Sequence, residues 1–302
     1  MCLSAVWQPS HVPATMTRMP SAEPTVTLLH DPARLAYDGA GPRPVQVSQW
    51  RSAREDAPLV VLSHGTGGSV AELAWWATAL RDAGFDVVGI DHHGNSYAAG
   101  TTALGFVCWW DRALDVSFVL DSVTARGPVG VAGFSLGGYT AGAVCGVRLS
   151  ERVVDALFSG TFELPPPPEY PTLREELDEL RDRTDPALAA ALPRRAAADL
   201  RDPRVRAGFL LCPALGPVLD DAATATGVGV PVMVRWTAAD TEAPPEVNGM
   251  RLTRAIRGAE GGPVGTPESG HYGFVIPAQD DPAAKADVVR DSLAFFTRTL
   301  TT

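Results

Sequence analysis

Short apolar runs alternate with longer segments of helical pattern from Pro58 to the end of the chain. Runs of about five apolar residues between turn residues predict buried strands, whereas apolar residues spaced three or four apart predict amphipathic helices. Strands that alternate with helices form a mostly parallel sheet with helices on both faces, because parallel neighbours need a crossover segment. The alternation predicts an α/β fold built on one central, mostly parallel sheet.

The individual elements follow from the same pattern. The predicted strands are residues 58–62, 85–90, 128–132, 205–212 and 230–236, and the predicted helices are residues 70–83, 109–124 and 138–147. Residues 44–50 precede this region, and their β-rich composition predicts an antiparallel edge strand. A chain of 302 residues can bury one large core, so we expect a single domain over residues 23–302.

The strand pattern is interrupted between residues 149 and 203. Four consecutive prolines at 165–168 precede a charged predicted helix, residues 173–183, whose leucines share one face. Such an apolar stripe must pack on something, and loops at the carboxyl edge of a parallel sheet shape its pocket. We expect residues 149–203 to be a lid insertion over an active site, and a solvated surface excursion is the alternative.

The charge balance is acidic, with a formal net charge of −10 and a pI near 5.0. A protein that neutralises nucleic-acid phosphates needs a basic face, so the balance argues against a nucleic-acid partner. No run reaches the roughly 18 apolar residues that a membrane helix needs. Lys285 is the only lysine, and we interpret this arginine bias as bacterial codon usage.

The amino terminus and the cysteines bear on localisation. Residues 1–22 have no basic segment that leads into a continuous apolar stretch, so we expect a disordered tail and no signal peptide. The four cysteines form no Cys-x-x-Cys motif and no cluster with histidine. Widely spaced cysteines of this kind indicate buried free thiols in a reducing compartment, and we expect a cytoplasmic protein.

The segment Gly133-Phe134-Ser135-Leu136-Gly137 fits the pattern G-x-S-x-G. In this pattern a strand turns sharply into a helix, and the serine hydroxyl is exposed at the top of the sheet. Glycines flank the serine because the strained turn leaves no room for Cβ atoms beside it. The motif directly follows one predicted strand and opens the next predicted helix, which is the context that the pattern requires. The sequence therefore predicts Ser135 as a nucleophile.

A serine nucleophile that attacks a carbonyl needs donors for the oxyanion that forms. The backbone N–H of Leu136 is one predicted donor, because it follows the nucleophile at a helix amino terminus. The second is expected from the loop after the first strand, with Thr66 preferred and Gly65 or Gly67 as alternatives. His64 and Gly65 are also expected to lie at the substrate, with His64 orienting the loop rather than acting as the base.

The acid and the base of such a site follow the serine in the order Ser, Asp or Glu, His. Asp240 comes just after the predicted strand 230–236, and His271 is the only histidine beyond it. His271 would take the Ser135 proton, and Asp240 would hold the histidine tautomer and stabilise the imidazolium. Glu242 is the alternative acid.

The segment Asp91-His92-His93-Gly94-Asn95-Ser96 follows the strand 85–90 and is expected to shape the pocket, with His93 at the substrate. A metal site formed by its aspartate and histidines is the weaker interpretation, because adjacent histidines point in different directions and no further ligand cluster supports them. We therefore expect no metal and no cofactor.

Two tryptophan pairs, Trp75-Trp76 and Trp109-Trp110, are expected to place one ring of each pair in the core and the other at a groove or at the lid. Trp109 and Trp110 are the candidates for lining a pocket that takes an apolar acyl group.

Six segments together resemble a known group of proteins. They are LSHGTGG (62–68), IDHHGNS (90–96), RALDVSFVLD (112–121), VAGFSLGGYTA (131–141), DLRDPRVRAGFLLCPALGP (199–217) and SGHYGF (269–274). The chain resembles the α/β-hydrolases that are named predicted dienelactone hydrolases, which are similar to bacterial platelet-activating-factor acetylhydrolase-like serine esterases. The resemblance covers most of the chain and implies an α/β-hydrolase fold, a triad of Ser135, Asp240 and His271, and no cofactor. True dienelactone hydrolases use a cysteine nucleophile, whereas position 135 is serine.

The motifs predict a serine hydrolase that cleaves a carboxylic ester, thioester or lactone through an acyl-enzyme on Ser135. A small-molecule acyl substrate is the only partner that the sequence indicates, and the oligomeric state is left open. Acyltransferase, cyclase, epimerase or peptidase chemistry on the same residues is the alternative, because a fold does not fix a substrate.

Overall fold

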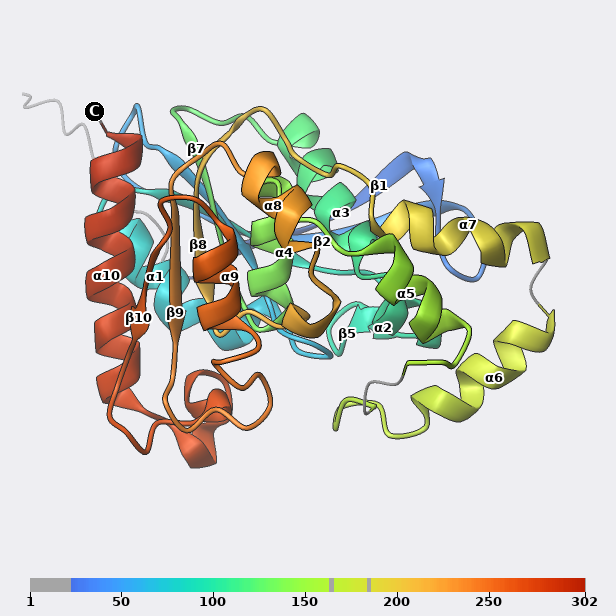
Figure 1. The fold of residues 1–302 in the computed structure, drawn as a ribbon. Coiled ribbons are helices and arrows are strands. Elements are labelled where there is room, and N and C mark those ends of the chain that lie inside the picture. The colour runs from blue at the N-terminus through green and yellow to red at the C-terminus, as the bar shows by residue number, and fades with distance from the viewer. Residues whose placement is uncertain (1–22, 163–165, 184–185, 302) are drawn as a thin grey trace, which may run out of the picture.

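The computed structural model describes residues 23–162, 166–183 and 186–301 (Figure 1). Its strands are β1 (Thr25–Leu35), β2 (Pro42–Trp50), β3 (Leu59–Ser63), β4 (Asp86–Asp91), β5 (Asn95–Ser96), β6 (Gly100–Thr101), β7 (Val129–Phe134), β8 (Val205–Leu211), β9 (Val232–Trp236) and β10 (Glu260–Pro263). Its α-helices are α1 (Ala74–Asp82), α2 (Ala103–Val107), α3 (Trp110–Ser122), α4 (Leu136–Cys145), α5 (Glu151–Phe158), α6 (Leu173–Arg183), α7 (Pro186–Ala196), α8 (Asp221–Gly227), α9 (Gly249–Ala255) and α10 (Pro282–Leu300). Short 3-10 helices are η1 (Val70–Leu73), η2 (Gly216–Val218), η3 (His271–Phe274) and η4 (Pro277–Gln279).

Eight strands form the central sheet in the order β1-β2-β4-β3-β7-β8-β9-β10. The pairs from β4 to β10 are parallel, and β2 is antiparallel to both of its neighbours. The prediction of a mostly parallel central sheet is confirmed. Parallel strands end at the same edge, so the loops after β3, β7, β8 and β9 meet on one side of the molecule.

The five predicted strands of the parallel region all form, each within two residues of its expected ends. The antiparallel strand expected at residues 44–50 also forms, but it is not at the edge, because β1 pairs outside it. Most side chains of β1 are exposed, so this strand has no buried face and leaves no apolar alternation in the sequence.

Helices cover both faces of the sheet, and Figure 1 shows α1 and α10 on one side with α4, α8 and α9 on the other. Alternate side chains of β3 supply the two cores, because successive residues of a strand point to opposite faces. Val60 and Leu62 pack in the cluster that includes Trp76 and Phe296, while Val61 packs in the cluster on the opposite face.

The insertion between α4 and β8 is helical, and it consists of α5, α6 and α7. Leu173 of α6 is 7 % exposed, and Leu177 packs partly buried against the same cluster as Leu173. Tyr170 contacts Phe106 of α2 edge to face, with ring centroids 4.8 Å apart. The insertion is therefore anchored on α2 through apolar contacts.

Three expectations fall outside the described residues: the disordered tail at 1–22, the first of the four prolines, Pro165, and the place of the Leu180 side chain on the apolar face of its helix. Within the described ranges, no helix is long and apolar enough to cross a membrane.

Candidate active site

Ser135 lies in the turn between β7 and α4, with φ 56° and ψ −119°. A non-glycine residue seldom adopts such angles, and the surrounding structure must hold it there. The Ser135 N–H donates to Leu211 O at 2.9 Å, and Ser135 O accepts from the N–H groups of Gly138 and Ala214 at 2.8 and 3.1 Å. These bonds fix the turn to the end of β8 and to the first turn of α4.

The two glycines of the motif are required by close backbone packing. A Cβ on Gly133 would lie 2.1 Å from Gly137 O, and a Cβ on Gly137 would lie 2.0 Å from Ser63 O. Both contacts are with backbone atoms, so a rotating side chain cannot relieve them.

We expect Gly137→Ala to lower the free energy of unfolding by about 3 kcal/mol or more, because β3 and α4 must separate to admit the methyl group. Gly229→Ala is the matched control, since its Cβ meets nothing within 4 Å, and we expect a change within about 0.5 kcal/mol. Urea unfolding of both variants measures the difference. Equal stabilities would show that the turn has more room than the structure gives it.

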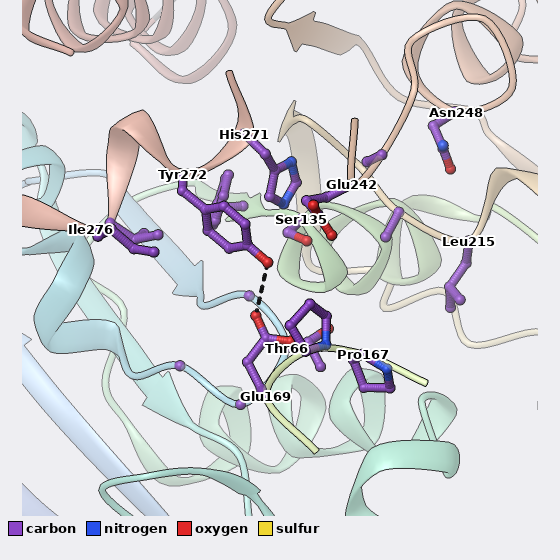
Figure 2. A pocket seen from close by; sticks show the side chains of 18 of the residues that line it. Thr66, Ser135, Pro167, Glu169, Leu215, Glu242, Asn248, His271, Tyr272 and Ile276 are labelled. Carbon is purple, nitrogen blue, oxygen red and sulfur yellow. Dashed lines mark hydrogen bonds between the residues drawn. The ribbon is translucent and has the colours of Figure 1, made fainter. Parts of the chain in front are cut away.

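A pocket of about 500 Å³ opens at Ser135, and Figure 2 shows its lining. Most of its walls are apolar, which suits an organic substrate. The lining residues are Gly65, Thr66, Gly67, Gly68, Glu72, Tyr97, Phe134, Ser135, Pro166, Pro167, Pro168, Glu169, Ala214, Leu215, Pro217, Glu242, Ala243, Pro244, Val247, Asn248, His271, Tyr272, Val275 and Ile276. They come from the end of β7, from the segments after β3, β5, β8 and β9, from the insertion, and from the turn that contains His271.

His271 and Asp240 form a buried pair beside Ser135. The Nδ1 of His271 lies 2.7 Å from Oδ2 of Asp240, and these residues are 6 % and 4 % exposed. Figure 2 shows the imidazole directed toward Ser135 at one end of the pocket. Within the described ranges no hydrogen bond joins the Ser135 hydroxyl to His271, and such bonds often close only when substrate is present.

The second oxygen of Asp240 accepts two backbone hydrogen bonds, from Glu242 N at 3.0 Å and from Ala243 N at 2.7 Å. The carboxylate is thus held in one orientation with both oxygens occupied. Glu242, the alternative acid, is exposed and lines the pocket, and its side chain makes no bond to His271. The geometry favours Asp240 as the partner of the histidine.

The two expected oxyanion donors belong to the loop after β3 and to the start of α4. Thr66 lines the pocket, and Leu136 N–H is at the first position of α4, directly after Ser135. Neither N–H has a backbone acceptor within the described ranges, so both can donate to a substrate oxygen. A Cβ on Gly65 would lie 3.3 Å from Ser135 Cβ, which shows how closely the loop approaches Ser135.

His64 is not at the pocket, so the expected substrate contact is wrong for this residue, whereas Gly65 does line it. The His64 side chain is fully buried, its Nδ1 lies 2.6 Å from Gly65 O, and its Nε2 accepts from His92 N at 3.2 Å. These partners fit a neutral imidazole, and burial lowers the pKa of His64 well below its ordinary value. His64 orients the loop from behind.

The loop after β4 is buried beneath the 64–68 loop instead of facing the pocket. His93 accepts from Tyr37 N at 3.2 Å and stacks on the Tyr37 ring, so the expected substrate contact of His93 is wrong as well. His92 Nδ1 lies 3.0 Å from Asp115 Oδ2, and burial lowers the pKa of His92 to about 3. The imidazoles of His92 and His93 therefore have separate partners and do not converge on a metal position.

Trp109 and Trp110 are both in the core, at 7 % and 2 % exposure, and neither lines the pocket. The expectation that one of them reaches the substrate is wrong, because the Trp110 ring packs on Phe158 of α5 and the Trp109 indole N–H donates to Phe106 O of α2. In the other pair Trp76 is fully buried and Trp75 is half-buried, stacked on Phe274.

The sequence analysis missed Glu169 and Tyr272, which both line the pocket. Tyr272 OH donates to Glu169 Oε1 at 3.3 Å, drawn as the dashed line in Figure 2. Glu169 comes from the proline-rich insertion, and Tyr272 directly follows His271. Adjacency to the predicted base was the one available signal for Tyr272, and no local signal marks Glu169.

One group of potential metal ligands occurs among the described residues, and it consists of Cys212, Asp240 and His271, with ligand atoms within 4.8 Å of one another. Its chemistry does not fit a metal, because His271 and Asp240 are hydrogen-bonded to each other. Burial also raises the pKa of the Cys212 thiol well above its ordinary value, whereas metals bind the thiolate.

The sheet order, the strained serine between β7 and α4, and the helices on both faces define an α/β-hydrolase fold. The family model described as serine aminopeptidase, S33, matches residues 54–213, and the chain belongs to this hydrolase family. The comparisons thus support the α/β-hydrolase superfamily, while the narrower resemblance to predicted dienelactone hydrolases remains a hypothesis.

Solved structures with the same fold include a ferulic acid esterase and Est1E. A ferulic acid esterase from Streptomyces cinnamoneus matches with a TM-score of 0.57 and 20 % identity over 96 % of this chain and 93 % of that one. Est1E from Butyrivibrio proteoclasticus matches with a TM-score of 0.51 and 12 % identity over 91 % of this chain and 98 % of that one. No curated protein sequence matches the chain.

Proposed function

We propose that the chain is a serine hydrolase that cleaves a carboxylic ester through an acyl-enzyme on Ser135. The proposal depends on one arrangement, in which the strained Ser135 and the buried His271–Asp240 pair meet at the end of an apolar pocket. In that pair, His271 Nδ1 lies 2.7 Å from Asp240 Oδ2. Membership of a hydrolase family and structural similarity to esterases agree with it.

The reaction follows from the roles of the three groups. His271 takes the hydroxyl proton as Ser135 Oγ attacks the carbonyl carbon, and it then gives that proton to the leaving alcohol. Water next attacks the acyl carbon while His271 again acts as the base, and Ser135 is released with its proton restored. Asp240 stays ionised and holds the Nδ1–H tautomer. The N–H groups of Thr66 and Leu136 bind the oxyanion, each worth about 3 kcal/mol of barrier.

The pocket indicates a small or medium acyl substrate. Its volume of about 500 Å³ suits a compact organic molecule, and Pro167, Leu215 and Ile276 supply apolar walls (Figure 2). A thioester or a lactone would undergo the same chemistry. The acyl-enzyme could also pass its acyl group to an acceptor other than water, which would make the protein an acyltransferase.

We propose that residues 149–203 act as a lid. Pro167 and Glu169 of this insertion line the pocket, and the hydrogen bond from Tyr272 to Glu169 joins the insertion to the turn that contains His271. A closed lid excludes water and strengthens the electrostatic interactions of the site.

Hydrolysis of neutral p-nitrophenyl esters from acetate to decanoate tests the proposed function. We expect turnover with a maximum at short or medium chains, and a burst of p-nitrophenol where deacylation is slow. Reaction with the ester in the presence of an alcohol acceptor separates transfer from hydrolysis. An enzyme that is folded but cleaves no ester, thioester or lactone would contradict the proposal.

The substrate should be neutral or cationic. Glu72, Glu169 and Glu242 line the pocket, and no lysine or arginine is among its described lining residues. We expect p-nitrophenyl hemisuccinate to have a kcat/KM at least about tenfold below that of p-nitrophenyl butyrate, because its one free carboxylate is repelled by these glutamates, whereas the butyrate ester is neutral.

In the variants Glu169→Gln and Glu242→Gln, the kcat/KM values for hemisuccinate and butyrate should differ less than in the unmodified enzyme. Glu246→Gln should leave it unchanged, because Glu246 is an exposed residue outside the pocket. Equal kcat/KM values for the two esters in the unmodified enzyme would refute the expected charge preference.

An aminopeptidase is the second candidate, and the same glutamates favour it, because a carboxylate near the nucleophile could bind the ammonium of a peptide amino terminus. Aminoacyl p-nitroanilides distinguish it from an esterase. Cleavage of the free-amine compounds and not of their N-acetyl forms would make this candidate the better one.

A cytoplasmic location is part of the proposal. Cys108, Cys145 and Cys212 are buried free thiols, as is typical of a reducing compartment.

A further inference from the structure

Arg112 of α3 is a charged side chain in the interior of the fold. It is 1 % exposed, and no carboxylate within the described ranges is at ion-pair distance from its guanidinium. Burial lowers its pKa to about 9. A buried charge is costly unless its hydrogen bonds are satisfied, so the partners of Arg112 show what this charge is used for.

Two of those partners hold the two ends of the loop that presents Thr66. Nη2 of Arg112 donates to His64 O, at the start of the loop. Nη1 donates to Asn95 Oδ1 at 2.8 Å, and the same Asn95 oxygen accepts from Gly67 N at 3.0 Å. The Thr66 N–H therefore lies in a segment whose two flanks are bonded to one guanidinium, directly or through Asn95.

The third partner belongs to the helix that presents the other donor. Nε of Arg112 donates to Thr140 Oγ1 at 3.1 Å, and Thr140 Oγ1 donates to Leu136 O at 3.0 Å. Leu136 is the first residue of α4, so the guanidinium is linked to both elements that supply the expected oxyanion donors.

We propose that Arg112 and Asn95 are positioning residues that set the separation of the Thr66 and Leu136 N–H groups. The inference rests on the proposed serine-hydrolase function. Neither side chain lines the pocket, so both act through the loop and the helix. A planar guanidinium suits this role because its donors point in fixed directions toward four acceptors, the fourth being Ser63 Oγ at 3.3 Å, whereas a lysine ammonium presents one compact group.

The test compares Asn95→Ala and Arg112→Lys with the control Arg34→Met. Asn95→Ala removes the link to Gly67 and leaves the Arg112 charge in place, so it is the variant more certain to stay folded. Arg34 belongs to the neighbouring ion-pair cluster, where it binds Asp31 and Asp115, and among the described residues it makes no hydrogen bond to the loop. The readouts are the unfolding midpoint, the second-order rate of fluorophosphonate labelling, and kcat and KM for a p-nitrophenyl ester.

We expect Asn95→Ala and Arg112→Lys to lower the labelling rate and kcat by roughly 10- to 100-fold, with KM within about threefold. This loss is smaller than that for deleting an oxyanion donor, because the donors remain and only lose alignment. Labelling depends on the same donors, since the phosphonyl oxygen occupies the position of the oxyanion. Arg34→Met should lower the unfolding midpoint and leave the labelling rate and kcat within about threefold.

Folded variants with labelling rates and kcat within threefold of the unmodified enzyme would overturn the inference. It would also be overturned if Arg34→Met lost labelling rate and kcat as strongly as Asn95→Ala and Arg112→Lys, in proportion to its lower unfolding midpoint. An unmodified enzyme that is neither labelled nor active would instead contradict the proposed function, and the inference would fail with it. The two failures are thus distinguished by the unmodified protein.

Discussion

Replacing Ser135 with alanine is expected to lower kcat/KM by roughly 10⁵-fold or more, since the variant has no group that can form the acyl-enzyme. The backbone of the turn should tolerate alanine as it tolerates serine, because the bonds that hold Ser135 are made by its N–H and C=O. Hydrolysis of the best p-nitrophenyl ester, with the unfolding midpoint measured in parallel, checks both statements.

Ser122→Ala is the matched control for Ser135→Ala. Ser122 is an exposed serine at the end of α3, and within the described part of the chain its hydroxyl donates only to the Phe118 carbonyl one turn earlier. We expect its kcat/KM to equal that of the unmodified enzyme. If Ser135→Ala kept a tenth of the activity while remaining pure and folded, the hydrolysis would come from another nucleophile.

Replacing Asp240 with asparagine should lower kcat by about 10⁴-fold. The amide keeps the shape of the carboxylate, but it cannot stabilise the imidazolium and it favours the wrong tautomer of His271, whose Nδ1 lies 2.7 Å from Asp240 Oδ2. The N–H groups of Glu242 and Ala243 keep the amide oxygen on their side, so the amide NH2 group faces His271 Nδ1. KM for a neutral ester should change much less than kcat.

Glu242→Gln provides the direct comparison, because Glu242 lies two residues away and was the alternative acid. Its side chain is exposed at the pocket and has no bond to His271, so we expect a change in kcat of less than tenfold with a neutral ester. A larger loss in Glu242→Gln than in Asp240→Asn would reverse the assignment of the acid.

The sheet could be predicted from the sequence because its parallel strands are buried on both faces. Residues of β3, β4 and β7 are all buried, and such strands appear as continuous apolar runs. β1 has the opposite character, since its side chains are mostly exposed, and its pairing is determined by β2 rather than by any pattern of its own.

Ser135 could be placed from a local rule, because the turn needs glycine at Gly133 and Gly137 and these residues are visible in the sequence. Asp240 and His271 could be placed from their order along the chain. The choice between Asp240 and Glu242 could not be made that way, because it depends on which carboxylate the folded loop directs toward the histidine.

Most of the pocket lining could not be predicted from the sequence, because it depends on how separate segments pack. His93 and Trp109 follow strands or loops near the pocket edge, yet each turns inward to a partner, Tyr37 and Phe106. Glu169 reaches the pocket only through the path of the insertion. Arg112 belongs to a segment already noted for its resemblance, but its contacts span loops more than 15 residues away in the chain.

The identity of the residue that reacts with a fluorophosphonate tests the central claim most directly. Trypsin should release residues 127–148 as one peptide, and Ser135 is its only serine. Mass spectrometry after labelling should find one adduct on that peptide, fragment ions should place it on Ser135, and His271→Ala should nearly abolish it. An adduct on another residue, or an active enzyme that the probe leaves unmodified, would contradict Ser135 as the nucleophile.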